Sequence, residues 1–183
     1  HHEGLAFFVE DAVPGDVVKA KIWKLKKNYA EARAVEIFTP SPHRIEAKCK
    51  HFGTCGGCRW QSLAYEAQLH FKHKNIVDVF KRIGGFENVE VRPVIGCEPP
   101  YYYRNKMEFT FSNERWLSSE EMQHKEEIKR EVAVGLHIPE RYDKVLNVEE
   151  CFLQSETSTR ILNTLREICV LWEMSAYSTK THT

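Results

Sequence analysis

The sequence lacks long hydrophobic runs, glycine-rich phosphate loops and internal repeats, and these absences narrow its possible functions. No apolar stretch is long enough to span a membrane. No strand, glycine-rich loop and helix follow one another in the pattern that holds a nucleotide, so we expect no nucleotide-like cofactor on this chain. The opening His1-His2-Glu3-Gly4 is no secretory signal, because no apolar segment follows a basic one. We therefore expect a cytoplasmic protein without membrane contact.

Cysteine is scarce as well, and its distribution excludes a secreted disulfide framework. Six cysteines in 183 residues are too few and too clustered for such a scaffold. Cys49, Cys55 and Cys58 fall within ten residues, spaced C-x5-C-x2-C, and Gly56 and Gly57 separate the last two. Glycine lets the backbone turn tightly and approach closely, and its amides can donate hydrogen bonds to sulfur. The pattern indicates a metal site built from reduced thiolates.

Three thiolates leave a four-cysteine iron–sulfur or zinc site one ligand short, so a fourth cysteine is expected elsewhere. Cys151 ends an apolar segment outside any helical stripe, and we predict that it is the fourth ligand. Cys97 lies in a loop before two prolines and is a weaker candidate. Cys169 falls on the apolar side of a predicted helix and is expected to be a small buried residue. Neither Cys97 nor Cys169 is predicted to be a nucleophile, because no base surrounds it.

The net charge of zero hides a division between the two halves of the chain. Residues 1–85 contain 14 Lys and Arg against 9 Asp and Glu, a net charge of +5. Residues 86–183 contain 12 against 17, a net charge of −5. A polyanionic partner is expected to bind the basic half, and the acidic half argues against a uniformly basic nucleic-acid binder.

The first forty residues predict short strands joined by tight turns. Strands are expected at 6–9, 17–27 and 30–38, and Val13-Pro14-Gly15-Asp16 has the composition of a turn. Apolar and charged residues alternate within 17–27, which predicts two different faces. The pattern is typical of a small β-barrel of the oligonucleotide-binding kind, here missing its first strand.

Basic side chains crowd the second of these strands. Contact with RNA phosphates and the solvated charges of an edge strand explain them equally well. Trp23 and Tyr29 can stack on bases, although burial is the commoner fate of such aromatic residues. Two further basic candidates lie near the middle of the chain, where a structural ion pair is the alternative. The candidate RNA-contacting residues are Lys21, Lys24, Lys26, Lys27, Arg104 and Lys106.

The rest of the chain predicts helices and antiparallel strands, which makes the fold class α+β. A helix is expected from a Ser62 cap to the Gly84-Gly85 stop signal, with an apolar stripe that includes Leu69, Ile76, Phe80 and Ile83. Further strands are expected at the ranges 90–95, 106–111, 132–138 and 145–148.

Two sequence signals predict where helices begin in the second half. Ser118-x-x-Glu121 resembles a capping box. Ser155 or Ser158 is expected to open a last helix. Its predicted buried face consists of Ile161, Leu165, Ile168 and Trp172, with Leu162 and Cys169 beside it.

These motifs, taken in order, resemble those of the RNA uracil-5-methyltransferases, which make 5-methyluridine in ribosomal and transfer RNA. The cysteine loop is the most specific match, and the likeness covers almost the whole chain. The matching segments are 13–16 with the lysine-rich strand, Ser41-Pro42-His43-Arg44, the cysteine loop with Gln61, Tyr65-x-x-Gln68-Leu69-x-x-Lys72, Tyr103-Arg104-Asn105-Lys106, Gly135-Leu136-His137-Ile138-Pro139 and Glu150-Cys151-x-Leu153.

The resemblance implies a division into domains and a cofactor. It implies a TRAM-like β-barrel that binds RNA over residues 1–40, an iron–sulfur central domain over 41–176 and the start of a linker at 177–183. It also implies a 4Fe–4S cluster. The implied ligands are Cys49, Cys55, Cys58 and Cys151.

The resemblance places the chemistry outside this chain. In the family, a Rossmann-like domain that follows binds S-adenosylmethionine and carries the cysteine nucleophile and the carboxylate base. We therefore assign no catalytic residue and no S-adenosylmethionine site here, and we expect the segment alone to be inactive. The expected partner is RNA, ribosomal (23S) rather than transfer RNA, and no obligate protein partner is expected.

Two other functions remain open at this point. One is an iron–sulfur redox protein, which would give a reversible electrochemical signal without binding RNA. The other is a stand-alone RNA-binding module stabilised by a metal such as zinc, which would be colourless, whereas iron–thiolate centres absorb near roughly 400 nm.

Overall fold

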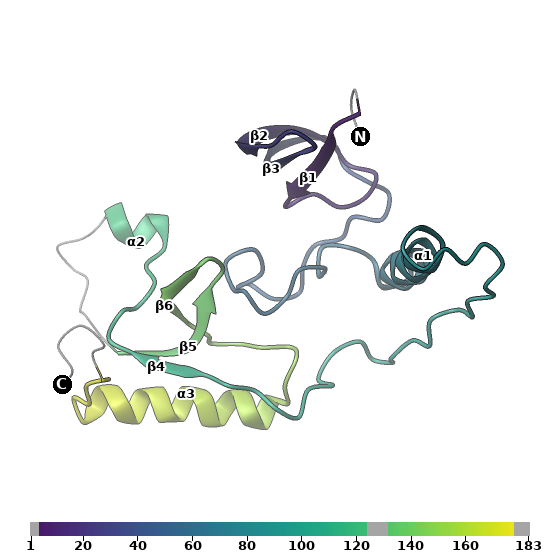
Figure 1. The fold of residues 1–183 in the computed structure, drawn as a ribbon. Coiled ribbons are helices and arrows are strands. Elements are labelled where there is room, and N and C mark those ends of the chain that lie inside the picture. Colours follow the sequence, from purple (N-terminus) through teal and green to yellow (C-terminus); the bar gives the residue numbers. More distant parts are fainter. Residues whose placement is uncertain (1–3, 124–131, 178–183) are drawn as a thin grey trace. The chain divides into compact units, whose positions relative to one another are not determined.

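The protein divides into two compact units. A computed structural model describes residues 4–123 and 132–177 (Figure 1). The first unit comprises residues 1–47 and 60–96, and the second comprises residues 48–59 and 97–183. The cysteine loop therefore belongs to the second unit, although the chain on both sides of it belongs to the first.

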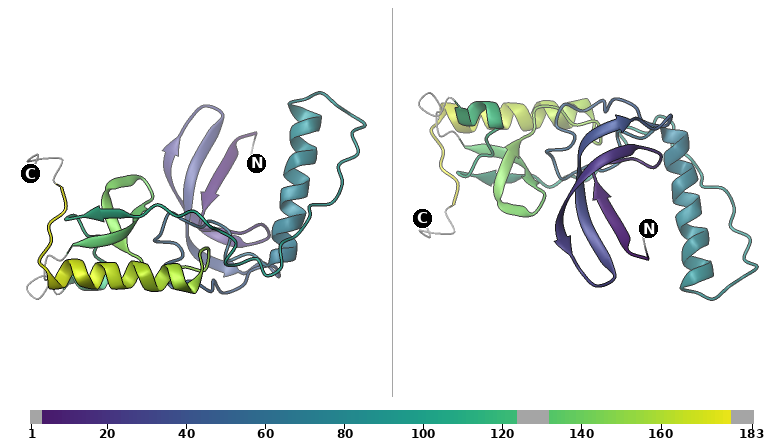
Figure 2. Two further views of the ribbon diagram at one scale, coloured as in Figure 1. Left: turned by 90° about the horizontal axis from the view of Figure 1, so that it is seen from below. Right: turned by 90° about the horizontal axis from the view of Figure 1, so that it is seen from above.

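A three-stranded sheet forms the first part of the first unit. Its strands are β1 (Ala6–Glu10), β2 (Val17–Leu25) and β3 (Tyr29–Thr39), in the order β1-β3-β2. β3 pairs parallel to β1 and antiparallel to β2, and Figure 2 shows the three strands side by side. The three predicted strands are confirmed. The barrel expected from them stays a prediction.

The predicted contrast between two faces of β2 is wrong. Ile22, on the predicted apolar face, is 48% exposed, and Trp23, on the other face, is 47% exposed. Burial in this sheet falls instead on the central strand β3, where Ala30 and Ala32 are fully covered. β2 is an edge strand of the sheet, so only one neighbour shields its side chains.

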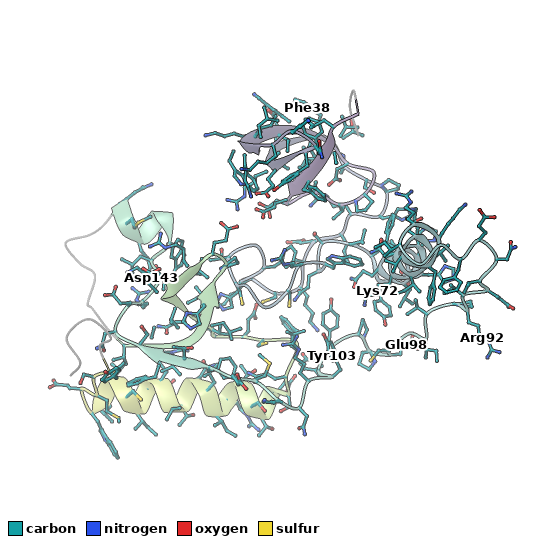
Figure 3. The ribbon with its side chains drawn as sticks, in the orientation of Figure 1. Phe38, Lys72, Arg92, Glu98, Tyr103 and Asp143 are labelled. Atoms are coloured by element: carbon teal, nitrogen blue, oxygen red, sulfur yellow. The ribbon has the colours of Figure 1, made fainter. Side chains whose placement is uncertain are left out.

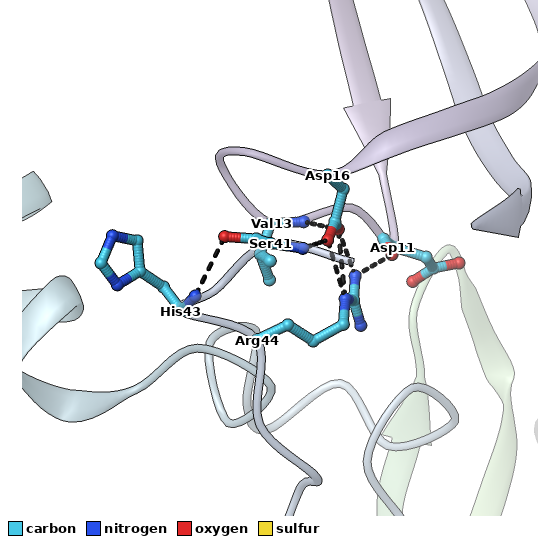
Figure 4. A network of polar contacts seen from close by, with 6 residues as sticks. All are labelled: Asp11, Val13, Asp16, Ser41, His43 and Arg44. Carbon is cyan, nitrogen blue, oxygen red and sulfur yellow. Dashed lines mark hydrogen bonds and ion pairs between the residues drawn. The ribbon is translucent and has the colours of Figure 1, made fainter. Parts of the chain in front are cut away.

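A buried carboxylate joins the turn before β2 to the segment after β3. The predicted turn is confirmed, since the Asp16 N–H donates to the Val13 carbonyl at 3.1 Å. The Asp16 side chain is fully covered and accepts hydrogen bonds from the backbone N–H groups of Val13 (2.7 Å) and Ser41 (2.8 Å). The Arg44 guanidinium completes the network at 2.5 Å (Figure 4). These bonds satisfy the carboxylate, so its charge can be held away from water.

Helix α1 (Tyr65–Arg82) completes the ordered elements of the first unit. Its predicted Ser62 cap is wrong: the residue at the N-cap is Ala64, which has no side-chain capping bond. The predicted stop is confirmed, because the helix ends directly before Gly84-Gly85 and Gly85 has a φ of +69°.

The apolar stripe predicted for α1 is exposed over its second half. The helix is buried only near its start, where Ala67 packs with Val13 and Leu63. Ile76 is 46% and Ile83 82% exposed. The expected strand at 90–95 is absent from this described segment, which has no regular structure.

The second unit contains an antiparallel sheet covered by a helix. The strands are β4 (Thr110–Ser112), β5 (Ala133–Ile138) and β6 (Arg141–Asn147), in that order. The strand predicted at 106–111 is shorter and shifted, but its inward Phe109 and Phe111 do pack against the core. That core consists of Val134, Val148 and Leu162, and α3 (Glu156–Leu171) lies along the sheet (Figure 1).

Both predicted helix starts in this unit are confirmed. Ser118 and Glu121 form a reciprocal capping box at α2 (Ser119–Gln123): each backbone N–H donates to the other's side chain, at 2.8 and 3.1 Å. Ser155 is the N-cap of α3 and accepts from the Ser158 N–H at 3.1 Å. Among the described residues, no helix is long and apolar enough to cross a membrane.

The predicted buried face of α3 is wrong. Ile161 is 64% exposed and Trp172 71% exposed, as are Leu165 (50%) and Ile168 (37%). The covered positions are Leu162 (4%) and Cys169 (5%), which confirms Cys169 as a small buried residue. Arg166 lies between them in the helix, and its Nη1 donates to the Val148 carbonyl at 3.1 Å. An arginine that satisfies backbone carbonyls thus replaces the expected apolar contact.

Candidate functional site

The cysteine loop, residues 49–58, is a series of turns held by hydrogen bonds, and three of the thiols lie on this short segment. The Phe52 N–H donates to the Cys49 carbonyl at 3.0 Å, and the Cys55 N–H donates to the His51 carbonyl at 2.8 Å. The Gly57 N–H then donates to Cys55 Sγ at 3.3 Å. This is the amide–sulfur hydrogen bond expected at a thiolate ligand.

The two glycines of the loop allow it to lie against strand β5. A Cβ on Gly56 would stand 3.3 Å from the His137 carbonyl oxygen. A Cβ on Gly57 would stand 3.4 Å from Cys55 Sγ and 3.5 Å from Leu136. A side chain at Gly56 would therefore crowd the β5 backbone, whereas one at Gly57 would stand at the limit of ordinary contact with Cys55 and Leu136.

Cys151 comes from a different segment of the same unit. It follows β6 and is half-buried, where it packs against the core formed by Val134, Val148 and Leu162. Cys49, Cys55 and Cys58 are likewise half-buried, and all six cysteines of the chain are thiols. Cys97 is exposed, and its thiol donates to the Pro99 carbonyl at 3.4 Å.

The electrostatics of the site disfavour bare thiolates. Burial raises the pKa of Cys49, and the negative charges of Glu150, Cys151 and Cys58 raise it further. Burial also raises the pKa of Cys55, with smaller contributions from Cys58, Cys49 and Cys151. The four sulfurs are therefore close enough to repel one another when ionised. A bound cationic centre would remove that penalty.

The donor set fits a polynuclear iron–sulfur group. Within the described residues, no three His, Cys, Asp or Glu side chains are arranged to hold one metal ion. A cluster is bound by four cysteine thiolates, and each thiolate binds a different iron, so its ligands need not converge on one atom. Four half-buried thiols in one unit, one of which accepts an amide hydrogen bond, supply the number and type of donors that such a cluster uses.

Polar contacts fasten the loop to the segment that carries Cys151. The Lys50 N–H donates to Glu150 Oε1 at 2.8 Å, and the Lys50 ammonium pairs with Glu149. The Glu149 N–H donates to His51 Nε2 at 3.1 Å. Burial lowers the pKa of His51, and the Lys50 charge adds to the effect, which favours the neutral ring that this bond requires.

The sequence pattern did not predict these fastening residues. Lys50 and His51 follow Cys49 directly, and Glu149 and Glu150 precede Cys151. Their adjacency to two predicted ligands was the available signal. The positive charge beside Cys49 and the negative charges beside Cys151 indicate that the two segments pair. The spacing of the cysteines alone does not indicate this.

Four of the RNA candidates lie on β2 or the turn that follows it, in the first unit. Lys24 is already engaged, since its ammonium binds Glu31 at 2.7 Å and lies 5.8 Å from the Tyr29 ring centre. Lys21, Lys26 and Lys27 are exposed and have no carboxylate partner among the described residues. They are the stronger candidates.

The other two candidates lie in the second unit. Lys106 pairs with Glu108 at 2.9 Å, but both side chains are at least 80% exposed, so the pair is weak and easily exchanged. The Arg104 side chain lies near the Met107 sulfur at 4.0 Å. Neighbouring Tyr103 is 58% exposed on the same extended segment (Figure 3).

The aromatic candidates for base stacking have partners of their own. The Arg33 guanidinium lies 5.6 Å from the Trp23 ring centre. The Tyr29 ring stands edge-on to Phe8, with 5.9 Å between ring centres. Trp23 nevertheless keeps 47% of its surface exposed.

Comparison with known proteins supports part of the expected relationship. Residues 1–35 match the TRAM domain. The TRAM match covers β1, β2 and most of β3, including all four lysine candidates of the first unit. Matches that cover most of this chain, but only part of each relative, extend the comparison beyond residue 35.

Those relatives are named RNA methyltransferases. An uncharacterised RNA methyltransferase of Chlorobaculum tepidum is 42% identical over 182 residues, which are 98% of this chain and 38% of that protein. One of Bacteroides thetaiotaomicron is 46% identical over 163 residues, which are 89% of this chain and 36% of that protein. The chain thus spans less than two fifths of the length of these relatives.

A solved structure extends the likeness to the fold. The Pyrococcus abyssi tRNA (uracil-54, C5)-methyltransferase, in complex with S-adenosyl-L-homocysteine, superposes with a TM-score of 0.56 at 26% identity. The match covers 97% of this chain and 36% of that one. The likeness therefore includes the second unit as well as the TRAM match.

Proposed function

We propose that this chain is the RNA-recognition and cluster-bearing part of an S-adenosylmethionine-dependent RNA uracil-5-methyltransferase that acts on 23S ribosomal RNA. The TRAM match, the relatives named RNA methyltransferases and the solved uracil methyltransferase support the proposal. The catalytic groups and the methyl donor belong, in this proposal, to the remainder of a longer protein. The segment alone is then inactive.

The cysteine site is proposed to hold a 4Fe–4S cluster. The single observation that carries this is the gathering of four half-buried thiols from residues 49–58 and 151 within one compact unit. Bound there, the cluster would supply a rigid cross-link, since methylation of uracil needs no electron. The proposed ligands are Cys49, Cys55, Cys58 and Cys151.

The basic residues are proposed to hold RNA while the target base leaves its stack. Uracil C5 is unreachable inside a stacked helix, so unstacking must be offset by contacts elsewhere on the RNA. Lys21, Lys26 and Lys27 supply exposed positive charge on the TRAM match. Arg104 and Lys106 are proposed as a second contact region.

Anaerobic reconstitution with ferrous iron and sulfide tests the cluster. We expect about four iron and four sulfide per chain and absorption near roughly 400 nm. A chain that instead binds zinc and stays colourless contradicts the cluster and favours a metal-stabilised RNA-binding module. A reversible electrochemical couple in a chain that binds no RNA favours a redox protein.

Salt-dependent binding tests the RNA contacts. Fragments of 23S ribosomal RNA and transfer RNA would be titrated at several salt concentrations, and the ribosomal fragments are expected to bind more tightly. Replacing both Lys26 and Lys27 with Ala should reduce the salt slope by about 1.4, because each lost phosphate contact on single strands lowers it by about 0.7. Lys81→Ala, on α1, is the matched control. An unchanged slope in the double variant contradicts the assignment.

A further inference from the structure

The ammonium group of Lys48 lies among three aromatic rings of the second unit. Its Nζ is 4.4 Å from the ring centre of Phe152, 4.9 Å from that of Tyr101 and 5.5 Å from that of Tyr102. Both tyrosine rings stand edge-on to Phe152, with 6.1 Å between centres. All three distances are within the range at which a ring face attracts a cation.

Backbone bonds hold these rings in place. The Tyr102 N–H donates to the Phe152 carbonyl at 2.7 Å, and the Arg104 N–H donates to the Leu153 carbonyl at 2.8 Å. Tyr102 has a φ of +60°, a conformation that a side-chain-bearing residue adopts only when its surroundings impose it. The group of Lys48, Tyr101, Tyr102 and Phe152, here called the aromatic clamp, is thus a built feature of this unit.

The aromatic clamp connects the two ends of the cysteine site. Lys48 directly precedes Cys49, and Phe152 directly follows Cys151. On the other side of these cysteines, Lys50 is bonded to Glu149 and Glu150. Cys49 and Cys151 therefore each lie between two contacts that join the same two segments, and none of those contacts needs a metal.

The Cys151 segment is itself anchored to the fold. Asn163 Nδ2 donates to the Glu149 carbonyl at 2.9 Å, and Arg166 Nη1 donates to the Val148 carbonyl at 3.1 Å. Both donors belong to α3. The loop is thus fastened to a segment that the helix already holds.

We propose that Lys48 is a positioning residue of the cysteine site, which keeps Cys49 beside Cys151 before any cluster binds. The cation–π contacts hold the Lys48 end of the cysteine loop against the segment that carries Cys151. The link to a cluster rests on the proposed function, but the positioning of the thiols is a property of the metal-free chain.

Thiol alkylation of the reduced, metal-free chain tests the proposal directly. Iodoacetamide would be added to wild type, Lys48→Met and Lys48→Arg, and each cysteine followed by mass spectrometry. Met keeps the length of the side chain but loses the charge, so Cys49 and Cys151 should react roughly three- to tenfold faster. Arg keeps a cation over the rings and should react as wild type does. Lys81→Met, which alters an exposed lysine of α1, should also match wild type.

The other cysteines show whether a substitution acts only at the cysteine site or unfolds the whole chain. Buried Cys169 should stay protected in Lys48→Met, and exposed Cys97 reports the reactivity of the reagent. Unchanged rates at Cys49 and Cys151 would overturn the proposal, and so would equal acceleration at Cys169. A wild-type Cys169 that reacts as fast as Cys97 would mean that the metal-free chain is unfolded, which also overturns it.

Cluster retention provides a second readout. In reconstituted protein treated with a chelator, the absorbance near roughly 400 nm should decay three- to tenfold faster in Lys48→Met, and Lys48→Arg should match wild type. Equal decay rates in all variants would contradict the proposed role of Lys48, but they would not contradict the proposed cluster. A wild type that forms no chromophore contradicts the proposed cluster, and the alkylation rates then decide the role of Lys48.

Discussion

At the scale of single residues, the Asp16 side chain is the centre of a hydrogen-bond network in the first unit. Its carboxylate accepts from two backbone N–H groups and from Arg44, and water does not reach it. We expect Asp16→Asn to lower the free energy of unfolding by about 2–3 kcal/mol, because Arg44 then loses its charged partner. Urea unfolding of the chain would measure this. Asp78→Asn, which removes an exposed pair with Lys74, should leave the midpoint nearly unchanged.

The same carboxylate predicts how stability depends on pH. Hydrogen bonds from Arg44 hold the pKa of Asp16 well below its usual range, despite the opposing effect of burial. The unfolded chain therefore takes up the Asp16 proton at a higher pH than the folded chain. The contribution is complete above about pH 5 and is lost as the pH falls through the folded pKa. Acid unfolding of wild type should thus be steeper than that of Asp16→Asn, and parallel profiles would contradict this.

At the scale of elements, α3 shows which sequence signals are reliable. The cap at Ser155 was predicted correctly, because capping depends on residues three positions apart. The buried face was predicted wrongly, because the most apolar stripe was chosen. The actual face includes Arg166, whose carbonyl partners lie 18 and 32 residues away. Helical periodicity does not report such partners.

Two leucines of α3 provide a matched test of that correction. Leu162 is 4% exposed and packs with Val134 and Val148, whereas Leu165 is 50% exposed. Leu162→Ala should lower the free energy of unfolding by about 2–4 kcal/mol, through lost burial and the cavity left behind. Leu165→Ala should change it by less than about 1 kcal/mol. Thermal or urea unfolding of both variants would measure the two changes. A larger loss of stability in Leu165→Ala than in Leu162→Ala would support the buried face predicted from the sequence.

At the scale of the whole molecule, the cysteine site closes a long loop. Cys151 follows Cys58 with 92 residues between them, so a shared centre would constrain the unfolded chain considerably. We expect Cys151→Ser to lose the iron of the reconstituted protein and to lower its melting temperature. Exposed Cys97→Ser should do neither. Full iron content and unchanged melting in Cys151→Ser would contradict the assignment of the fourth ligand.

Features set by residues close together in the sequence were predicted more reliably than features set by residues far apart in it. The capping box at Ser118, the turn at Val13 and the positions of the three strands in the first unit are local patterns, and they were predicted. Lys48 was missed, because its partners are aromatic residues at least 53 positions away and no charge pattern marks them. The exposure of the second half of α1 was not predicted, because the spacing of apolar residues indicates only which side of a helix they share. It does not indicate whether another element covers that side.

The assignment of residues 48–59 to the second unit has a consequence for biosynthesis. The loop is translated long before the strands and helix against which it folds. At about 5–20 residues per second, roughly 5–19 s separate the synthesis of Cys58 from that of Cys151. The proposed fourth ligand is thus the last to be made, so the proposed cluster can be completed only after the segment that carries Cys151 has been synthesised.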